Sequence, residues 1–209
     1  EEKGAFIDSF VSGKENVTRH ANIFALLFGY ADAAQQEKII KNVLQNDAIL
    51  QIRTPYFKFY ELEAMCLMGS QEKVTQRIRD YWGSMLEAGA TTFWEEYTPM
   101  LPWEEQLAMY GDKYGKSLCH AWGASPIYLL GRYYMGVRPT QPGYKTFEVV
   151  PDAGGLDWFQ GTVPVGEGSV FVHMQPEVLE VCADVGGGVL CWKGERFPIK
   201  ENEVIRLPR

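Results

Sequence analysis

The sequence has little positive charge and no long apolar run. Its 209 residues carry 20 Lys and Arg against 27 Asp and Glu, which gives a formal net charge of −7. Nucleic acids and anionic membranes are bound by basic faces, so this balance argues against both as partners. No apolar stretch reaches the roughly 20 residues that a transmembrane helix needs. A neutral sugar is indifferent to net charge and stays open as a ligand.

Cysteine is also scarce, and its spacing fits no metal site. None of Cys66, Cys119, Cys182 and Cys191 forms a CxxC pair, and the first two lie in apolar helical patterns. We therefore expect buried free thiols there, with a Cys182–Cys191 pair across a hairpin as the alternative in an exported protein. A glycine-rich phosphate loop, a nucleophile elbow and zinc spacing are missing too, so neither a metal nor a cofactor is expected.

The chain opens with Glu1-Glu2-Lys3-Gly4 rather than with Met, and no signal peptide follows. This is the start that an excised fragment would have. We therefore expect a piece of a longer protein, for which a missing signal peptide says nothing about location.

Two textures divide the sequence near residues 137–142. The first part has the apolar period of helices with short links, which pack as antiparallel neighbours. After Pro139 the sequence changes to short β-rich runs between Gly and Pro, typical of a small antiparallel sandwich. The predicted domains are residues 1–137 and 138–209. The predicted helices cover 19–30, 33–44, 55–69, 70–89 and 118–135, and the predicted strands 147–151, 168–172, 178–181 and 188–192.

The long segment between the last two predicted helices, residues 91–116, is rich in aromatic and acidic residues, and such loops are usually functional. In an extended run, neighbours point to opposite sides, so Glu95 and Glu96 cannot both face one pocket. One should face the site, and the other solvent or a salt bridge. Trp94 would then pack behind Glu95. Spacing alone does not choose between the carboxylates, and an exposed acidic pair is the alternative.

His120 stands where the last predicted helix begins, two residues before Trp122. A helix N-terminus disfavours the imidazolium, and a neutral imidazole both donates and accepts hydrogen bonds to sugar hydroxyls. A structural histidine that closes the loop is the alternative. Carboxylates between flat aromatic rings are typical of proteins that grip and cut sugars.

Several of these motifs together resemble one family. They are Val17-Thr18-Arg19-His20-Ala21-Asn22, Thr54-Pro55-Tyr56-Phe57, Gly89-Ala90-Thr91-Thr92-Phe93-Trp94-Glu95 and His120-Ala121-Trp122-Gly123. They resemble the C-terminal part of bacterial α-L-rhamnosidases of glycoside hydrolase family 78. The resemblance implies the helical half of an (α/α)6 barrel followed by a small antiparallel β-sandwich, and an inverting hydrolase that removes terminal α-L-rhamnose from a rhamnose-containing glycoside.

The resemblance also implies roles for single residues. Glu95 is similar in place to the family's general base. His120 resembles a rhamnose-binding residue, with Trp122 beside it and Trp94 in the pocket wall. The family's general acid lies in a motif like Asp-x-Pro-x-Arg-x-Glu, which has no match here. We therefore expect a fragment that lacks the acid, is inactive alone and self-associates through its exposed half-barrel helices.

Two rival interpretations stay open. One is a different (α/α)-barrel carbohydrate enzyme, such as a glucosidase or phosphorylase relative. The other is a non-catalytic sugar-binding or assembly module, for which Trp158 and Trp192 would form a platform if both were exposed and coplanar. For a full-length rhamnosidase, we favour a periplasmic or extracellular location.

Overall fold

The computed structural model describes residues 4–11 and 16–209 and forms two compact units. The helical unit comprises Glu1–Gly69 and Arg77–Ser125, and the sheet unit comprises Ser70–Gln76 and Pro126–Arg209. The change from helix to strand comes at Val137, whereas the sheet unit also contains residues 70–76 and 126–136. The domain boundary at 137–138 therefore stays a prediction.

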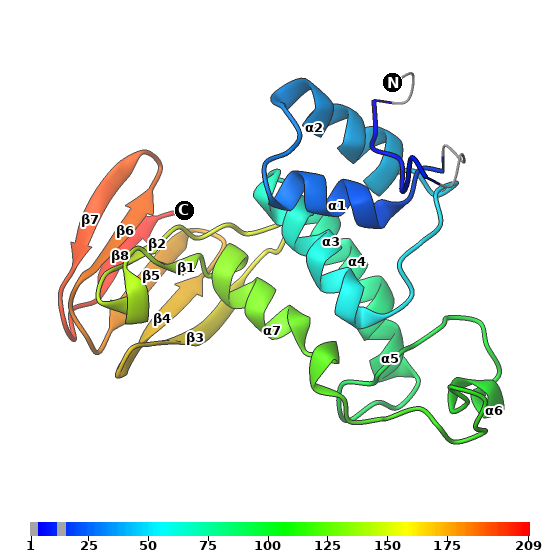
Figure 1. The fold of residues 1–209 in the computed structure, drawn as a ribbon. Coiled ribbons are helices and arrows are strands. Elements are labelled where there is room, and N and C mark those ends of the chain that lie inside the picture. Colours follow the sequence, from blue (N-terminus) through cyan, green and yellow to red (C-terminus); the bar gives the residue numbers. More distant parts are fainter. Residues whose placement is uncertain (1–3, 12–15) are drawn as a thin grey trace. The chain divides into compact units, whose positions relative to one another are not determined.

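The helical unit begins with two helices that the sequence predicts well (Figure 1). α1 (Arg19–Leu27) packs against α3 (Pro55–Leu67), and α2 (Ala33–Ile39) continues as a π-helical turn, Ile40–Leu44. Asp32 and Gln35 form a reciprocal capping box at the start of α2, which satisfies backbone donors that a helix end leaves free. α3 opens with a proline, whose missing N–H costs nothing in the first turn.

The next helical segment is broken into short pieces. α4 (Gln71–Ile78) leads into a π-helical turn, Arg79–Gly83, and then α5 (Ser84–Glu87). The predicted helix 70–89 covers all three. α6 (Trp103–Gln106) follows within the long loop, at the Trp-Glu-Glu run where early acids favour the helix dipole. No helix in the described part of the chain is long and apolar enough to span a bilayer.

The last predicted helix, 118–135, begins too early. Its regular part is α7 (Ser125–Leu129) with a π-helical turn, Leu130–Tyr134, and only a single 3-10 turn, Ala121–Gly123, comes before it. His120 has extended backbone angles, φ −128° and ψ 117°. It is the N-cap of that single turn rather than a residue of the predicted long helix, whose start at residue 118 is wrong. The reason is a non-local pairing of this segment, described below.

A buried ion cluster lies inside the helical unit. Arg19 and Glu61 are both 0% exposed, and Arg19 Nη1 lies 2.5 Å from Glu61 Oε1. Arg77 Nη1 contacts the same oxygen at 3.0 Å. Arg19 also donates to the carbonyls of Leu44 and Asn46 at 2.7 and 3.0 Å. Buried charges of this kind are tolerated because each is paired and hydrogen-bonded.

The sheet unit holds two four-stranded sheets (Figure 1), ordered β1-β2-β6-β7 and β3-β4-β5-β8. The first contains β1 (Val137–Pro139), β2 (Phe147–Val149), β6 (Gly188–Trp192) and β7 (Glu195–Ile199). The second contains β3 (Phe159–Val165), β4 (Gly168–Met174), β5 (Val178–Ala183) and β8 (Ile205–Pro208). The sheets are antiparallel, as predicted, apart from β2, which pairs with β6 in parallel. Every other pairing of these strands is antiparallel.

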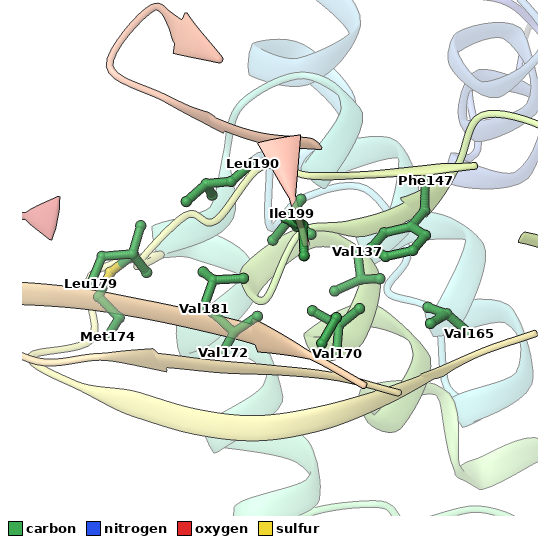
Figure 2. Packing of buried hydrophobic residues seen from close by; sticks show 12 residues of the cluster. Val137, Phe147, Val165, Val170, Val172, Met174, Leu179, Val181, Leu190 and Ile199 are labelled. Atoms are coloured by element: carbon green, nitrogen blue, oxygen red, sulfur yellow. The ribbon is translucent and has the colours of Figure 1, made fainter. Parts of the chain in front are cut away.

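The two sheets share an apolar core (Figure 2). Alternate residues of β4 and β5 point into it, as the period of two requires, and Phe147 and Leu190 come from the other sheet. Gly136, with φ +76°, precedes β1 at a tight approach. A Cβ there would lie 2.0 Å from the carbonyl oxygen of Val150, so the position requires glycine.

The four cysteines are free, but not all are buried. Cys66 is buried, as expected, whereas Cys119 is exposed because its segment lies outside the helix that was predicted there. Cys182 lies on β5 and Cys191 on β6, which belong to different sheets. The alternative of a disulfide across one hairpin is therefore wrong.

Candidate active site

Two segments that are distant in sequence are joined by hydrogen bonds to their backbones. The N–H of Glu95 donates to the carbonyl of Ser117 at 2.9 Å, and the N–H of His120 donates to the carbonyl of Phe93 at 2.7 Å. The side chain of Thr92 also donates to the carbonyl of Leu118. This pairing uses the backbone groups that a helix would need, which is why residues 118–120 are not helical. It brings Glu95 and His120 together.

Gly123 allows the following turn to close onto this pair of segments. A Cβ at Gly123 would lie 2.9 Å from both the Cβ of Phe93 and the carbonyl oxygen of Trp94. Any larger residue would push the two segments apart. The Nε1–H of Trp82 donates to the carbonyl of Gly123 at 2.8 Å. This bond links the turn to the π-helical turn Arg79–Gly83.

The carboxylate of Glu95 is buried and held at both oxygens. The residue is 5% exposed. Oε1 accepts a hydrogen bond from the hydroxyl of Tyr110 at 3.0 Å, and Oε2 accepts one from the N–H of Ser117 at 3.0 Å. Nδ1 of His120 lies 3.8 Å from Oε2. A carboxylate held in this way has a defined orientation, which suits a group that must accept a proton from one water molecule.

Glu96 has different partners, as the alternation of an extended chain predicts. Its Oε1 lies 3.3 Å from Nε of Arg53, and its side chain is 14% exposed. The next residue, Tyr97, donates its N–H to the hydroxyl of Tyr81 at 3.0 Å. Of the two neighbouring carboxylates, only Glu95 lies beside His120 among the contacts of the described residues.

Aromatic rings extend from His120 away from the carboxylate. The rings of His120 and Trp122 are 4.2 Å apart between centroids and tilted by 32°, and Trp122 and Tyr56 are 5.5 Å apart. Nε1 of Trp122 donates to the carbonyl of Glu95 at 3.0 Å. The His120 side chain is 32% exposed, so it can reach a ligand. The predicted residues Glu95, His120 and Trp122 thus form one cluster.

Trp94 lies apart from this cluster. It is 3% exposed and packs against Tyr97 and Trp103, each with a centroid distance of 5.9 Å. Its packing behind Glu95 stays a prediction. Little of its ring is free for a ligand, and its place in a pocket wall stays a prediction.

Sequence reasoning missed Tyr110. The segment Met109 to Asp112 forms a tight hairpin turn in which the two end residues exchange N–H to carbonyl bonds of 3.0 and 2.9 Å. Tyr110 and Gly111 at its centre have φ of 53° and 82°. The hydrogen bond to the Glu95 carboxylate raises the pKa of Tyr110. In the sequence, only the pair Tyr110-Gly111 indicated a turn with positive φ angles.

Two lysines of the helical unit are also unusual. Lys116 is 8% exposed, and burial lowers its pKa, while the charges of Glu96 and Glu95 oppose the change. Lys58 borders a cavity of about 430 Å³, and its Nζ lies 4.5 Å from the ring centroid of Tyr81. Burial lowers the pKa of Lys58 to about 8. The described residues contain no group of three or more His, Cys, Asp or Glu arranged for a metal ion.

Comparison with known proteins places this site in a family. The bacterial alpha-L-rhamnosidase 6 hairpin glycosidase domain matches residues 2–134. The chain belongs to this rhamnosidase family. The predicted resemblance is therefore confirmed. A search of curated proteins found no match.

Two solved rhamnosidases are similar in structure. A family 78 rhamnosidase of Bacillus sp. GL1 is 25% identical with a TM-score of 0.71, over 91% of this chain and 20% of that one. A rhamnosidase from Klebsiella oxytoca, solved with rhamnose bound, is 26% identical with a TM-score of 0.54, over 63% of this chain and 25% of that one. The chain thus spans a fifth to a quarter of these rhamnosidases. Helices followed by two largely antiparallel sheets are the predicted fold class, which is confirmed.

Proposed function

We propose that this chain is the part of an inverting α-L-rhamnosidase that carries the general base, Glu95. The carboxylate of Glu95, buried and anchored at both oxygens, carries the proposal. A general base must direct one lone pair at the attacking water. The hydrogen bonds from Tyr110 and Ser117 fix the orientation of the carboxylate for this. Membership of the rhamnosidase family supports rhamnose as the sugar released.

His120 and Trp122 are proposed to bind the sugar beside the base. The partly exposed imidazole can hydrogen-bond to sugar hydroxyls. Its ring also contacts the Trp122 indole. Trp122 in turn is tied to the backbone of Glu95. A sugar that contacts His120 would therefore be positioned relative to the base. The rhamnose bound to the Klebsiella relative supports a sugar ligand.

The general acid is proposed to lie outside residues 1–209. Inversion uses two carboxyl groups about 6.5–9.5 Å apart, so that a water fits between the base and the anomeric carbon. Glu96 is a poor second partner because it pairs with Arg53. The proposal is supported by the greater length of the similar rhamnosidases. Without an acid, the chain alone should show little hydrolysis, since general acid catalysis contributes about 10²–10⁴-fold.

A sugar-binding module in the sheets has weaker support. Trp158 is 60% exposed, as a platform requires. Trp192 is half-buried and donates its Nε1–H to the carbonyl of Pro208 at 3.0 Å. One face-exposed ring is less than the paired platform that this alternative needs.

Hydrolysis of p-nitrophenyl α-L-rhamnoside tests the proposal. The full-length enzyme, its Glu95→Gln and Glu96→Gln variants, and the isolated chain would be compared. We expect a fall of about 10²–10⁴-fold for Glu95→Gln, a small change for Glu96→Gln, and no turnover by the isolated chain. Proton NMR of the released sugar should show inversion at the anomeric carbon. Full activity of Glu95→Gln would exclude Glu95 as the base, and retention of configuration would exclude the mechanism.

A further inference from the structure

We infer that Tyr110 is a positioning residue that holds the Glu95 carboxylate in its working orientation. The inference rests on the proposed role of Glu95 as the base. Tyr110 supplies one of the two hydrogen bonds to the carboxylate, at 3.0 Å on Oε1, and the backbone of Ser117 supplies the other on Oε2. The terminal torsion of a glutamate is soft. With one anchor alone, the carboxylate could swing about that bond.

The usual reasons for a tyrosine do not explain this one. Its backbone has φ 53° at the centre of a tight turn, a conformation that favours Gly, Asn and Asp and strains a residue with a bulky side chain. The residue is 78% exposed, so burial in the core does not hold it there. The hydrogen bond from its hydroxyl to Glu95 is the contact that accounts for a tyrosine at this position.

The other charged groups near Glu95 would stay in place if the hydroxyl were removed. His120 lies 3.8 Å from Oε2, and the charges of Glu95 and Glu96 act on Lys116. Arg53 remains paired with Glu96. The bond to Glu95 raises the pKa of the Tyr110 phenol, so a titration of this phenol can test the contact.

Two substitutions in the full-length enzyme separate positioning from turn shape. Tyr110→Phe keeps the ring and removes the hydroxyl, and Tyr110→Asn suits the turn but cannot reach Glu95. We expect both to lower kcat about 10-fold, as loss of a hydrogen bond to a charged group would, with KM changed less than about 2-fold. Tyr114→Phe, an exposed tyrosine of the same loop, is the matched control. Wild-type kcat in Tyr110→Asn would show that Tyr110 only shapes the turn and would overturn the inference.

NMR on the isolated chain provides a second readout. With tyrosine labelled at Cζ, the Tyr110 signal is identified by its loss in Tyr110→Phe. Its titration midpoint should fall in Glu95→Gln, because the carboxylate charge that opposes ionisation is gone. An unchanged midpoint would show that the two groups do not meet. If the wild-type enzyme does not cleave the rhamnoside, the proposed function fails and the role of Tyr110 in it fails too. If the wild-type enzyme cleaves it, Glu95→Gln is impaired and the Tyr110 variants keep full rates, the inference alone fails.

Discussion

Nε1 of Trp122 lies 3.0 Å from the carbonyl oxygen of Glu95, so one hydrogen bond joins the two motifs of the candidate site. The bond acts on the backbone rather than on the carboxylate. It therefore positions the peptide that carries Glu95, while Tyr110 and Ser117 hold its side chain. The same indole supports the ring of His120. The base and the proposed sugar-binding residue thus depend on one side chain.

Replacing Trp122 by Phe should remove one of the hydrogen bonds that join the two motifs and leave the backbone bond between His120 and Phe93. The ring contact with His120 is largely kept, but the hydrogen bond to Glu95 is lost, which should lower the free energy of unfolding by about 1 kcal/mol. Urea unfolding of the isolated chain measures this change. Trp158→Phe, which alters an exposed ring, is the control and should change stability little. Equal stability of Trp122→Phe and the wild type would contradict a structural role for this bond.

Sequence reasoning found the inner strands of the sheets and missed all four edge strands. β2, β4, β5 and β6 each carry a predicted run, whereas β1, β3, β7 and β8 lie at the sheet edges. Each missed strand contains a proline: Pro139, Pro164, Pro198 and Pro208. Proline is confined to sheet edges because it cannot donate to a ladder, and there it also hinders pairing with another chain. The prolines that interrupt the strand pattern in the sequence therefore mark the edge strands of the two sheets.

The sequence predicted which residues belong to the candidate site, but not the contacts that bring them together. The run around Glu95 and the His120 motif stood out in the sequence, and the family resemblance selected them. Leu118 and Cys119 continue the apolar pattern of the helix that follows, so the extended pairing of this segment with Phe93 was invisible. Tyr110 reaches Glu95 only because of two positive φ angles in succession. Such non-local and turn-dependent contacts leave no periodic signal.

The buried cluster around Arg19 predicts a large loss of stability in Arg19→Met. The change leaves Glu61 with Arg77 as its remaining basic contact and removes a donor from the carbonyls of Leu44 and Asn46. We expect a loss of about 3–5 kcal/mol, as for other broken buried pairs. Thermal and urea unfolding measure it. Arg53→Met, in which the lost arginine is 69% exposed, should cost less than about 1 kcal/mol. Similar losses in both variants would show that the cluster is not buried in solution.

Lys58 should make stability depend on pH. Its pKa is lowered from 10.5 to about 8, first by burial, against the opposing charge of Glu61. Between these values the unfolded chain holds more protons than the folded one, so the free energy of unfolding should rise with pH from about 8 towards 10.5. In Lys58→Met this part of the rise should be absent, and stability at pH 7 should increase by about 1–3 kcal/mol.

Urea unfolding between pH 6.5 and 10 measures the Lys58 effect. Lys116, whose pKa is also lowered, contributes to the rise in both proteins, so the difference between the two curves reports Lys58. Tyr81, whose pKa is raised by burial, titrates above this range. Lys113→Met, at an exposed position, is the control. Parallel curves for Lys58→Met and the wild type would show that the Lys58 ammonium is solvated in the folded chain.

Aromatic side chains exposed on the helical unit predict that the isolated chain self-associates. Phe28 and Tyr30 at the end of α1 are 66% and 76% exposed, and Tyr56 on α3 is 45% exposed. The Phe24 ring contacts both Phe28 and Phe57, and Phe57 contacts Tyr56. Phe28 and Tyr56 therefore belong to one connected group of aromatic rings, and proteins rarely leave a large apolar surface open to water. Sedimentation velocity at increasing concentration should show dimers or larger species. The Phe28→Ser/Tyr30→Ser double variant should shift the balance towards monomer, whereas Trp158→Ser, an equally exposed ring of the sheet unit, should not. A wild-type chain that stays monomeric at the highest concentration would show that this surface has no affinity for itself.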